Sequence, residues 1–329
     1  MNEFNSIFKL ELEAYLSIRE SILSVSAAKH ERCYLKRFDE YLLLVSRDRV
    51  PEINEELMNN WLSSLKGKSS SIENEVIVVR QFLRYLAKTG VPVFAPAVPK
   101  VRDDYVPYIF SDNELELIFH SADNITLQYA QPNKLLVIIF PTILRLMFSC
   151  GLRIGETCEL QMKDVDLENG ILHMKHTKGN KHRLVPMSTT MTEILREYCL
   201  VLGIIAQPDA WLFPSVDRQS PISQKTIKNR FDVILRDNEI RLKNRKKHER
   251  GPCLHCLRHV FAFKSFSQAQ QIGVTLDDSI PYLSIYLGHE RLNETSKYLK
   301  FSSILYPRSV TDFGDFIQDL LPEVNYEIE

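Results

Sequence analysis

The first 90 residues carry apolar side chains at the spacing of amphipathic helices, in which positions three and four apart share a face. Breaks in this pattern fall at Pro51, at the polar run 66–71 and at Thr89. Four helices with short connections form a small bundle. The pattern therefore predicts an all-helical first domain, with helices over Phe8–Leu23, Tyr34–Val45, Ile53–Leu65 and Ile72–Leu86.

Four prolines between Pro92 and Pro107 then interrupt the helical pattern. Proline fixes φ and lacks a backbone N–H donor, so this stretch predicts an extended linker. We expect a helical domain over residues 1–91, a linker over 92–107 and a second domain over 108–329. A length of 329 residues fits two domains of ordinary size.

The second domain mixes helical patterns with one short alternating segment. Ser111 stands ahead of an apolar helix, as a helix cap does, and a longer apolar helix is predicted over Leu135–Phe148. Apolar and polar residues alternate on both sides of Lys178-Gly179-Asn180, which is typical of a β-hairpin. Helical patterns resume afterwards. The predicted fold class is mainly α with a small antiparallel β-sheet (α+β).

Composition excludes several classes of protein. Hydrophobic residues make up 44% of the chain and charged residues 25%, which is ordinary for a globular protein. No apolar run approaches the roughly 18 residues of a membrane span, and the N-terminus lacks the pattern of a signal peptide. Six scattered cysteines do not indicate a disulfide scaffold. We therefore expect a cytoplasmic protein without a membrane partner.

The net charge of −1 conceals a separation of charge along the chain. Six Asp or Glu residues and no Lys or Arg follow Thr311, so the rest of the chain carries +5. A basic body beside an acidic tail fits phosphate binding, although a solvated loop and a solvated tail would look the same. The candidate DNA-binding residues form one basic segment: Arg241, Lys243, Arg245, Lys246, Lys247 and Arg250.

Four short segments carry the candidate chemistry, and each of them alone would be commonplace. They are Gly151–Glu156, Thr177–Lys181, His255–His259, and Leu287–His289 followed nine residues later by Tyr298. In this combination and order the chain resembles the tyrosine recombinase (phage integrase) family. The resemblance covers the whole second domain. It extends more loosely to the first, which is similar to the family's helical core-binding, SAM-like domain.

The residue types suit attack on a phosphodiester. Such attack builds negative charge on phosphorus, and arginine forks match phosphate oxygens, which suits Arg153 and Arg258. His255 and Arg258 lie three apart on one predicted helix, so both can face one phosphate. A tyrosine nucleophile has a pKa near 10 and needs a base, for which His255 is the expected group. Lys178, at the hairpin tip, can supply the proton that the leaving oxygen needs.

The resemblance completes these roles. It implies that Tyr298 is the nucleophile and that His289 hydrogen-bonds the phosphate. It also implies that Glu156 orients the catalytic residues without touching the phosphate itself. It further implies a 3′-phosphotyrosine intermediate and a free 5′-hydroxyl. Because the bond energy stays in that link, the reaction needs no ATP, no metal and no other cofactor.

The chain departs from the family pattern at several positions. Cys256 stands where the family often has Asp, and Val260 stands where it often has Thr or Ser. Residues 268–279 and 123–133 resemble insertions. These insertions favour a mobile-element integrase or transposase, acting in integration, excision or transposition, over a compact resolvase of chromosome or plasmid dimers. We expect no extra N-terminal arm-binding domain like that of large phage integrases.

Other interpretations stay open. A type IB topoisomerase uses nearly the same residues, but the linker and the two domains suit a recombinase better. A catalytically inactive DNA-binding protein would usually have lost the arginines or the tyrosine. A structural metal site is the weakest alternative, since it needs a second ligand pair beyond the cluster Cys253, His255, Cys256 and His259.

The expected partner is double-stranded DNA, bound by a homo-tetramer on two DNA sites, with accessory recombination proteins as further candidates. The acidic tail carries a one-sided apolar stripe, which predicts docking either on its own domain or on a neighbouring protomer. The stripe consists of Phe313, Phe316, Ile317, Leu320 and Leu321.

Overall fold

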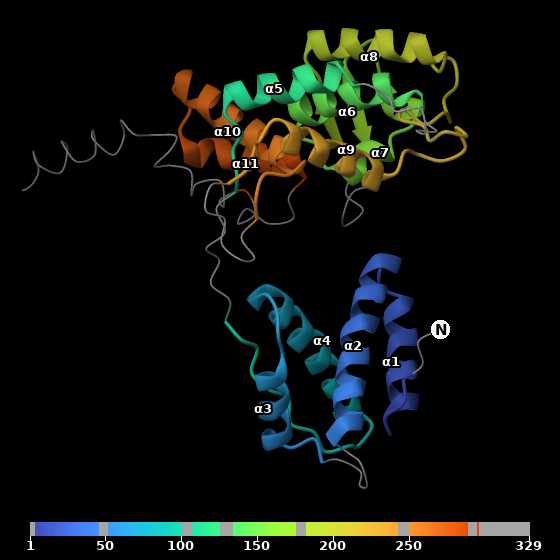
Figure 1. The fold of residues 1–329 in the computed structure, drawn as a ribbon, viewed down its shortest axis with the longest axis vertical. Coiled ribbons are helices and arrows are strands. Elements are labelled where there is room, and N and C mark those ends of the chain that lie inside the picture. Colours follow the sequence, from blue (N-terminus) through green and yellow to red (C-terminus); the bar gives the residue numbers. More distant parts are fainter. Residues whose placement is uncertain are drawn as a thin grey trace, which may run out of the picture. The chain divides into compact units, whose positions relative to one another are not determined.

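The computed structural model describes residues 4–45, 52–100, 107–125, 134–175, 182–242, 250–288 and residue 295 (Figure 1). The chain forms two compact units, residues 1–104 and 105–329. Helices dominate both units, and the second also holds a small antiparallel sheet. The predicted fold class is confirmed.

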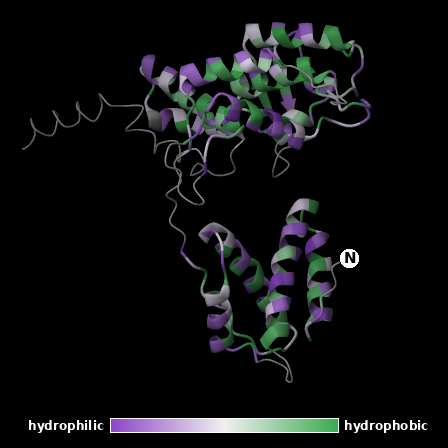
Figure 2. Ribbon diagram, in the orientation of Figure 1, coloured by the Kyte–Doolittle hydropathy of each residue, from purple (hydrophilic) through white to green (hydrophobic). Residues whose placement is uncertain are grey.

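The described residues of the first unit form a bundle of four helices. Hydrophobic and hydrophilic stretches alternate along α1 and α2 in Figure 2, as expected for helices that bury one face. The rings of Phe38 and Trp61 meet edge to face in the core, with centroids 5.1 Å apart. The helices are α1 (Lys9–Glu20), α2 (Val25–Val45), α3 (Glu55–Ser64) and α4 (Ser69–Lys88).

Two details of this unit differ from the sequence prediction. Helix α2 begins at Val25, well before the predicted start at Tyr34, because its first turns are mostly polar and give little apolar signal. The second difference is at the start of the predicted linker, where residues form specific contacts with the first unit. Val93 forms a β-bridge with Ile53, and Arg80 donates a hydrogen bond to the Pro96 carbonyl, so this stretch packs on the first unit.

The second unit is built around α6, whose sequence is apolar on nearly all sides. A helix of this kind is expected to be fully buried, and α6 packs against α5, α7, α8 and α10. Ser111 caps α5 in a reciprocal pair with Glu114, as the sequence predicted. The helices are α5 (Asp112–Asp123), α6 (Leu136–Cys150), α7 (Ile154–Cys158), the 3-10 turn η1 (Met162–Asp164), α8 (Thr189–Leu202), α9 (Gln224–Asp237), α10 (Cys256–Gln271) and α11 (Leu276–Leu287).

The sheet contains the predicted hairpin strands and one more. Strands β1 (Val165–Asp166), β2 (Ile171–Met174) and β3 (Arg183–Pro186) lie in the order β1-β2-β3, and all neighbours are antiparallel. Leu172 and Met174 point into the core, as their alternation predicted. Strand β1 is too short to produce an alternating pattern. The predicted turn at 178–180 lies outside the described residues.

Helix α11 packs against both α10 and β3. Hydrogen bonds join the end of α11 to Arg153 and Arg183, which lie more than 100 residues earlier in the sequence. The described part of the chain holds no helix long and apolar enough to cross a membrane.

Candidate active site

Arg258, in the first turn of α10, is the buried centre of the site. Its side chain is only 1% exposed. Nη1 donates a hydrogen bond of 2.7 Å to the Gly151 carbonyl, and Nη2 donates one of 2.7 Å to the Leu287 carbonyl. The guanidinium therefore connects the end of α6 to the end of α11.

Gly151 is required by this arrangement for two reasons. It ends α6 with a left-handed φ of 60°, a conformation that glycine adopts without strain. A Cβ at this position would also lie only 2.5 Å from the Phe261 ring of α10. Both conditions let α10 approach closely enough for Arg258 to reach the carbonyl.

Arg153 approaches the same place from the start of α7. Nη1 donates to Glu156 Oε1 at 2.8 Å, and Nη2 lies 3.5 Å from the Gly288 carbonyl at the end of α11. A quarter of its side chain is exposed, so Arg153 is more accessible than Arg258. The two predicted arginines therefore converge on residues 287–288, directly before His289.

Arg183 on β3 is a member of the site that sequence reasoning missed. Its Nη2 donates to Glu156 Oε2 at 2.7 Å, and its Nε donates to the Tyr286 carbonyl at 3.0 Å. Its side chain is only 7% exposed. Arg183 thereby links the strand that follows the Lys178 segment to Glu156 and to the end of α11.

Gly288 allows this link. Its φ of 65° ends α11 in the left-handed region, and an added Cβ would lie 2.9 Å from Nη1 of Arg183. A side chain here would displace the arginine from its position between α11 and Glu156.

Glu156 accepts hydrogen bonds from Arg153 and Arg183, an arrangement that fits the predicted orienting role. Burial alone would raise the pKa of this carboxyl group. Hydrogen bonds and charge from Arg183 and Arg153 outweigh that effect and hold the pKa below its usual value. Glu156 is therefore a carboxylate at neutral pH and fixes the direction of both guanidinium groups.

His255 immediately precedes α10, three residues before Arg258. It keeps solvent-accessible surface, yet its ring is partly withdrawn from water and surrounded by cations. Partial desolvation, followed by the charges of Arg258, Arg153, Arg250 and Lys228, lowers its pKa to about 4. His255 is therefore neutral at neutral pH and can accept a proton. Lys228, exposed on α9, is a second cation that sequence reasoning missed.

The structure thus brings together Arg153, Glu156, His255 and Arg258. Lys178, His289 and Tyr298 lie outside the described residues, although the described neighbours of His289 contact both arginines. The predicted DNA-binding residues Lys243, Arg245, Lys246 and Lys247 and the apolar tail residues also lie outside. Among the residues proposed for DNA binding, Arg241 and Arg250 are described, and both are exposed.

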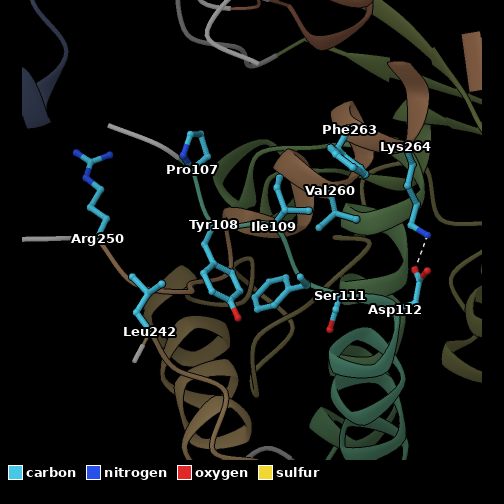
Figure 3. Close-up of a pocket in the computed structure, with 11 residues that line it drawn as sticks. Pro107, Tyr108, Ile109, Ser111, Asp112, Leu242, Arg250, Val260, Phe263 and Lys264 are labelled. Carbon is cyan, nitrogen blue, oxygen red and sulfur yellow. Dashed lines mark hydrogen bonds and ion pairs between the residues drawn. The ribbon is translucent and has the colours of Figure 1, made fainter. Parts of the chain in front are cut away.

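A cavity of 520 Å³ lies on another face of α10 (Figure 3). Val260, Phe263 and Lys264 of α10 line it together with the segment Pro107–Asp112, and Arg250 stands at its edge. Val260 follows Arg258 by two residues, about 200° around a helix, so the cavity and the arginine site occupy different faces.

At the start of α10, the two histidine rings contact each other and the two cysteine sulfur atoms lie close together. The rings of His255 and His259 meet edge to face at 4.7 Å, and the sulfur atoms of Cys253 and Cys256 lie 3.7 Å apart. Across the described ranges, no three His, Cys, Asp or Glu side chains are grouped so that they could hold a metal ion.

A site with two anchored arginines and a neutral histidine can bind an oxyanion and accept a proton beside it. The same combination is expected of the tyrosine-type strand-transfer enzymes that the sequence resembles. Residues 109–303 match the model of the phage integrase family. The chain belongs to this family and is a site-specific DNA recombinase of the tyrosine type.

A relative agrees with this membership, and solved structures share the fold. A tyrosine recombinase of Pseudothermotoga lettingae is 27% identical over 288 residues, which cover 86% of this chain and 88% of that protein. The post-cleavage complex of XerH recombinase with palindromic difH has a TM-score of 0.68 at 19% identity and covers 92% of this chain and 84% of its own. A lambda integrase tetramer on a Holliday junction has a TM-score of 0.66 at 17% identity, covering 90% and 78%.

Proposed function

We propose that this recombinase cuts DNA through a 3′-phosphotyrosine formed by Tyr298. The Tyr298 oxygen attacks the scissile phosphorus, the bond from phosphorus to the 5′-oxygen breaks, and the tyrosine proton passes to His255. Lys178 donates a proton to the leaving 5′-oxygen, which becomes a free hydroxyl. Rejoining reverses these steps with the 5′-hydroxyl of another strand.

The observation that carries this proposal is the convergence of Arg153 and Arg258 on residues 287–288. Charge develops on the phosphoryl oxygens during the attack, and preorganised cations there stabilise it. Arg153 is partly exposed and can donate hydrogen bonds to the phosphate. Arg258 is buried and contributes its positive charge. The next residue is His289, which we place at the same phosphate.

The proton transfer is supported by the low pKa of His255. An imidazole that is neutral before DNA binds is ready to act as a base. A bound phosphate brings negative charge next to the ring, and negative charge raises the pKa of an imidazole. His255 thereby becomes a stronger base when the substrate is in place.

For the rest of the chain, we propose a clamp around duplex DNA. The helical first unit would act as a core-binding domain, and the basic segment 241–250 would contact phosphates. Four protomers would act on two DNA sites, with the apolar tail docking on a neighbour. The departures at residues 123–133 and 268–279 favour integration, excision or transposition of a mobile element.

The test uses nicked duplexes cut from DNA flanking the protein's own gene, with EDTA present. Wild type is expected to form a protein–DNA adduct that resists SDS, and Tyr298→Phe is expected to form none. Tyr282→Phe is the matched control, because Tyr282 is 76% exposed on α11. Binding without an adduct in wild type would favour an inactive DNA-binding protein.

A further inference from the structure

Cys253 and Cys256 flank His255, and the proposed reaction uses neither of them. Their sulfur atoms lie 3.7 Å apart in a tight turn closed by a 2.8 Å hydrogen bond from the Cys256 amide to the Cys253 carbonyl. The turn leads directly into α10, so the chain has a Cys-x-x-Cys pair at the start of a helix. In redox proteins this arrangement is reactive.

The two thiols stand in different environments. Cys253 is half-buried, whereas Cys256 is fully buried, four residues before Val260 and on the same face of α10. The hydrogen bond from the Cys256 thiol lowers the pKa of Cys253 to about 6, and the same pairing, together with burial, raises the pKa of Cys256. A half-buried thiol with a lowered pKa thus lies beside a fully buried thiol with a raised pKa.

We propose that Cys253 and Cys256 are a redox-active pair whose oxidation closes a disulfide across His255 and slows DNA cleavage. This regulatory part rests on the proposed function, whereas disulfide formation does not. The other described cysteines differ: Cys150, Cys158 and Cys199 are buried with raised pKa values, and Cys33 is exposed in the first unit.

The oxidant is a low-molecular-weight disulfide such as oxidised glutathione. The Cys253 thiolate attacks one of its sulfurs, forming a mixed disulfide and releasing one glutathione thiolate. Cys256 then loses its proton and attacks the Cys253 sulfur, which releases the second glutathione thiolate. Two electrons pass from the pair to glutathione, and the two thiol protons end on the two glutathione molecules.

The link to cleavage is geometric. A disulfide requires an S–S distance of about 2.05 Å, so the sulfur atoms must approach from 3.7 Å. The ring closes over Leu254 and His255 and therefore shifts the turn that carries the proposed base. Displacing a reacting group by about 1 Å can slow a reaction by about a hundredfold.

The test treats the full-length protein with mixtures of oxidised and reduced glutathione. Free thiols are then blocked with N-ethylmaleimide at acidic pH, and digests are examined by mass spectrometry. Wild type and Cys33→Ser are expected to yield one peptide holding both Cys253 and Cys256, unlabelled and lighter by two hydrogen atoms. Labelling of both cysteines at every mixture, or a mixed disulfide that never closes, would overturn the proposal.

Cleavage of nicked duplex is measured on the same samples. Oxidation is expected to slow the wild type at least about tenfold, with recovery in dithiothreitol. Cys253→Ser, at the half-buried position, is expected to stay active and insensitive. A closed disulfide with unchanged cleavage would refute the regulatory role. A reduced protein that cleaves nothing would instead count against the proposed function, because the thiol measurement stands without DNA.

Discussion

His255 shows how position sets the chemistry of a single residue. Its folded-state pKa of about 4 lies below the ordinary 6.5, so the unfolded chain takes up a proton at higher pH than the folded protein does. The stability that neutral His255 contributes is full above pH 6.5 and is lost as the pH falls from 6.5 towards 4.

A measurable difference follows for His255→Gln, which cannot titrate. Wild type is expected to lose more stability than this variant when the pH is lowered from 7 to 4.5. Thermal unfolding of both proteins across that range measures the difference. Equal losses would show that desolvation and the surrounding cations do not depress the pKa of His255.

Lys178 provides a second test at the residue scale. Lys178→Ala is expected to cleave an ordinary duplex at least about a hundredfold more slowly, because the leaving 5′-oxygen then lacks its acid. A duplex with sulfur in place of the bridging 5′-oxygen should be cleaved at nearly the wild-type rate, since a thiolate leaves without a proton. A variant that stays slow on the sulfur substrate would exclude Lys178 as the general acid.

At the scale of single residues, the sequence identifies the site residues that stand in a recognisable motif. Arg153, His255 and Arg258 are found in this way, and the structure brings them together. Arg183 could not be found, because an arginine in a short strand is usually solvated. Its burial arises only when Tyr286, 103 residues away, packs over β3 and offers its carbonyl.

Among the secondary-structure elements, β3 follows the Lys178 segment in the sequence and carries Arg183, which bonds to Glu156 in the arginine site. Arg183→Gln is expected to slow single-turnover cleavage by about ten- to a hundredfold, because Glu156 loses one of the two groups that fix it. The dissociation constant for DNA should change little. Arg183→Lys should recover part of the rate, since its charge can still face Glu156.

Arg196→Gln is the matched control for this prediction. Arg196 is an exposed arginine of α8 whose side chain donates to the Leu167 carbonyl, away from the site. If Arg183→Gln weakened DNA binding and left the rate in the complex unchanged, Arg183 would bind DNA directly and would not be a positioning residue.

Helix and strand prediction succeeded where burial leaves a periodic signal. The apolar length of α6 and the alternation of Leu172 and Met174 are of this kind. The first turns of α2 and the whole of β1 leave no such signal. The former are polar, and the latter has only two residues and depends on pairing with β2.

For the whole molecule, the separation of charge predicts how binding responds to salt. Replacing Lys243, Arg245, Lys246 and Lys247 by Gln should reduce the slope of log K against log salt by about 0.9 for each phosphate that the protein no longer neutralises. Fluorescence anisotropy with labelled duplex measures this slope. Lys163→Gln with Arg196→Gln serves as control, because Lys163 is paired with Asp209. An unchanged slope would remove the basic segment from the DNA interface.

The central claim is that Tyr298 completes the site assembled from Arg153, His255 and Arg258. The most direct measurement isolates the covalent adduct of wild-type protein with nicked duplex, digests protein and DNA, and locates the attached nucleotide by mass spectrometry. We expect a nucleotide linked through its 3′-phosphate to the Tyr298 oxygen, with a free 5′-hydroxyl on the released strand. A nucleotide on any other residue, or linkage through a 5′-phosphate, would contradict the claim.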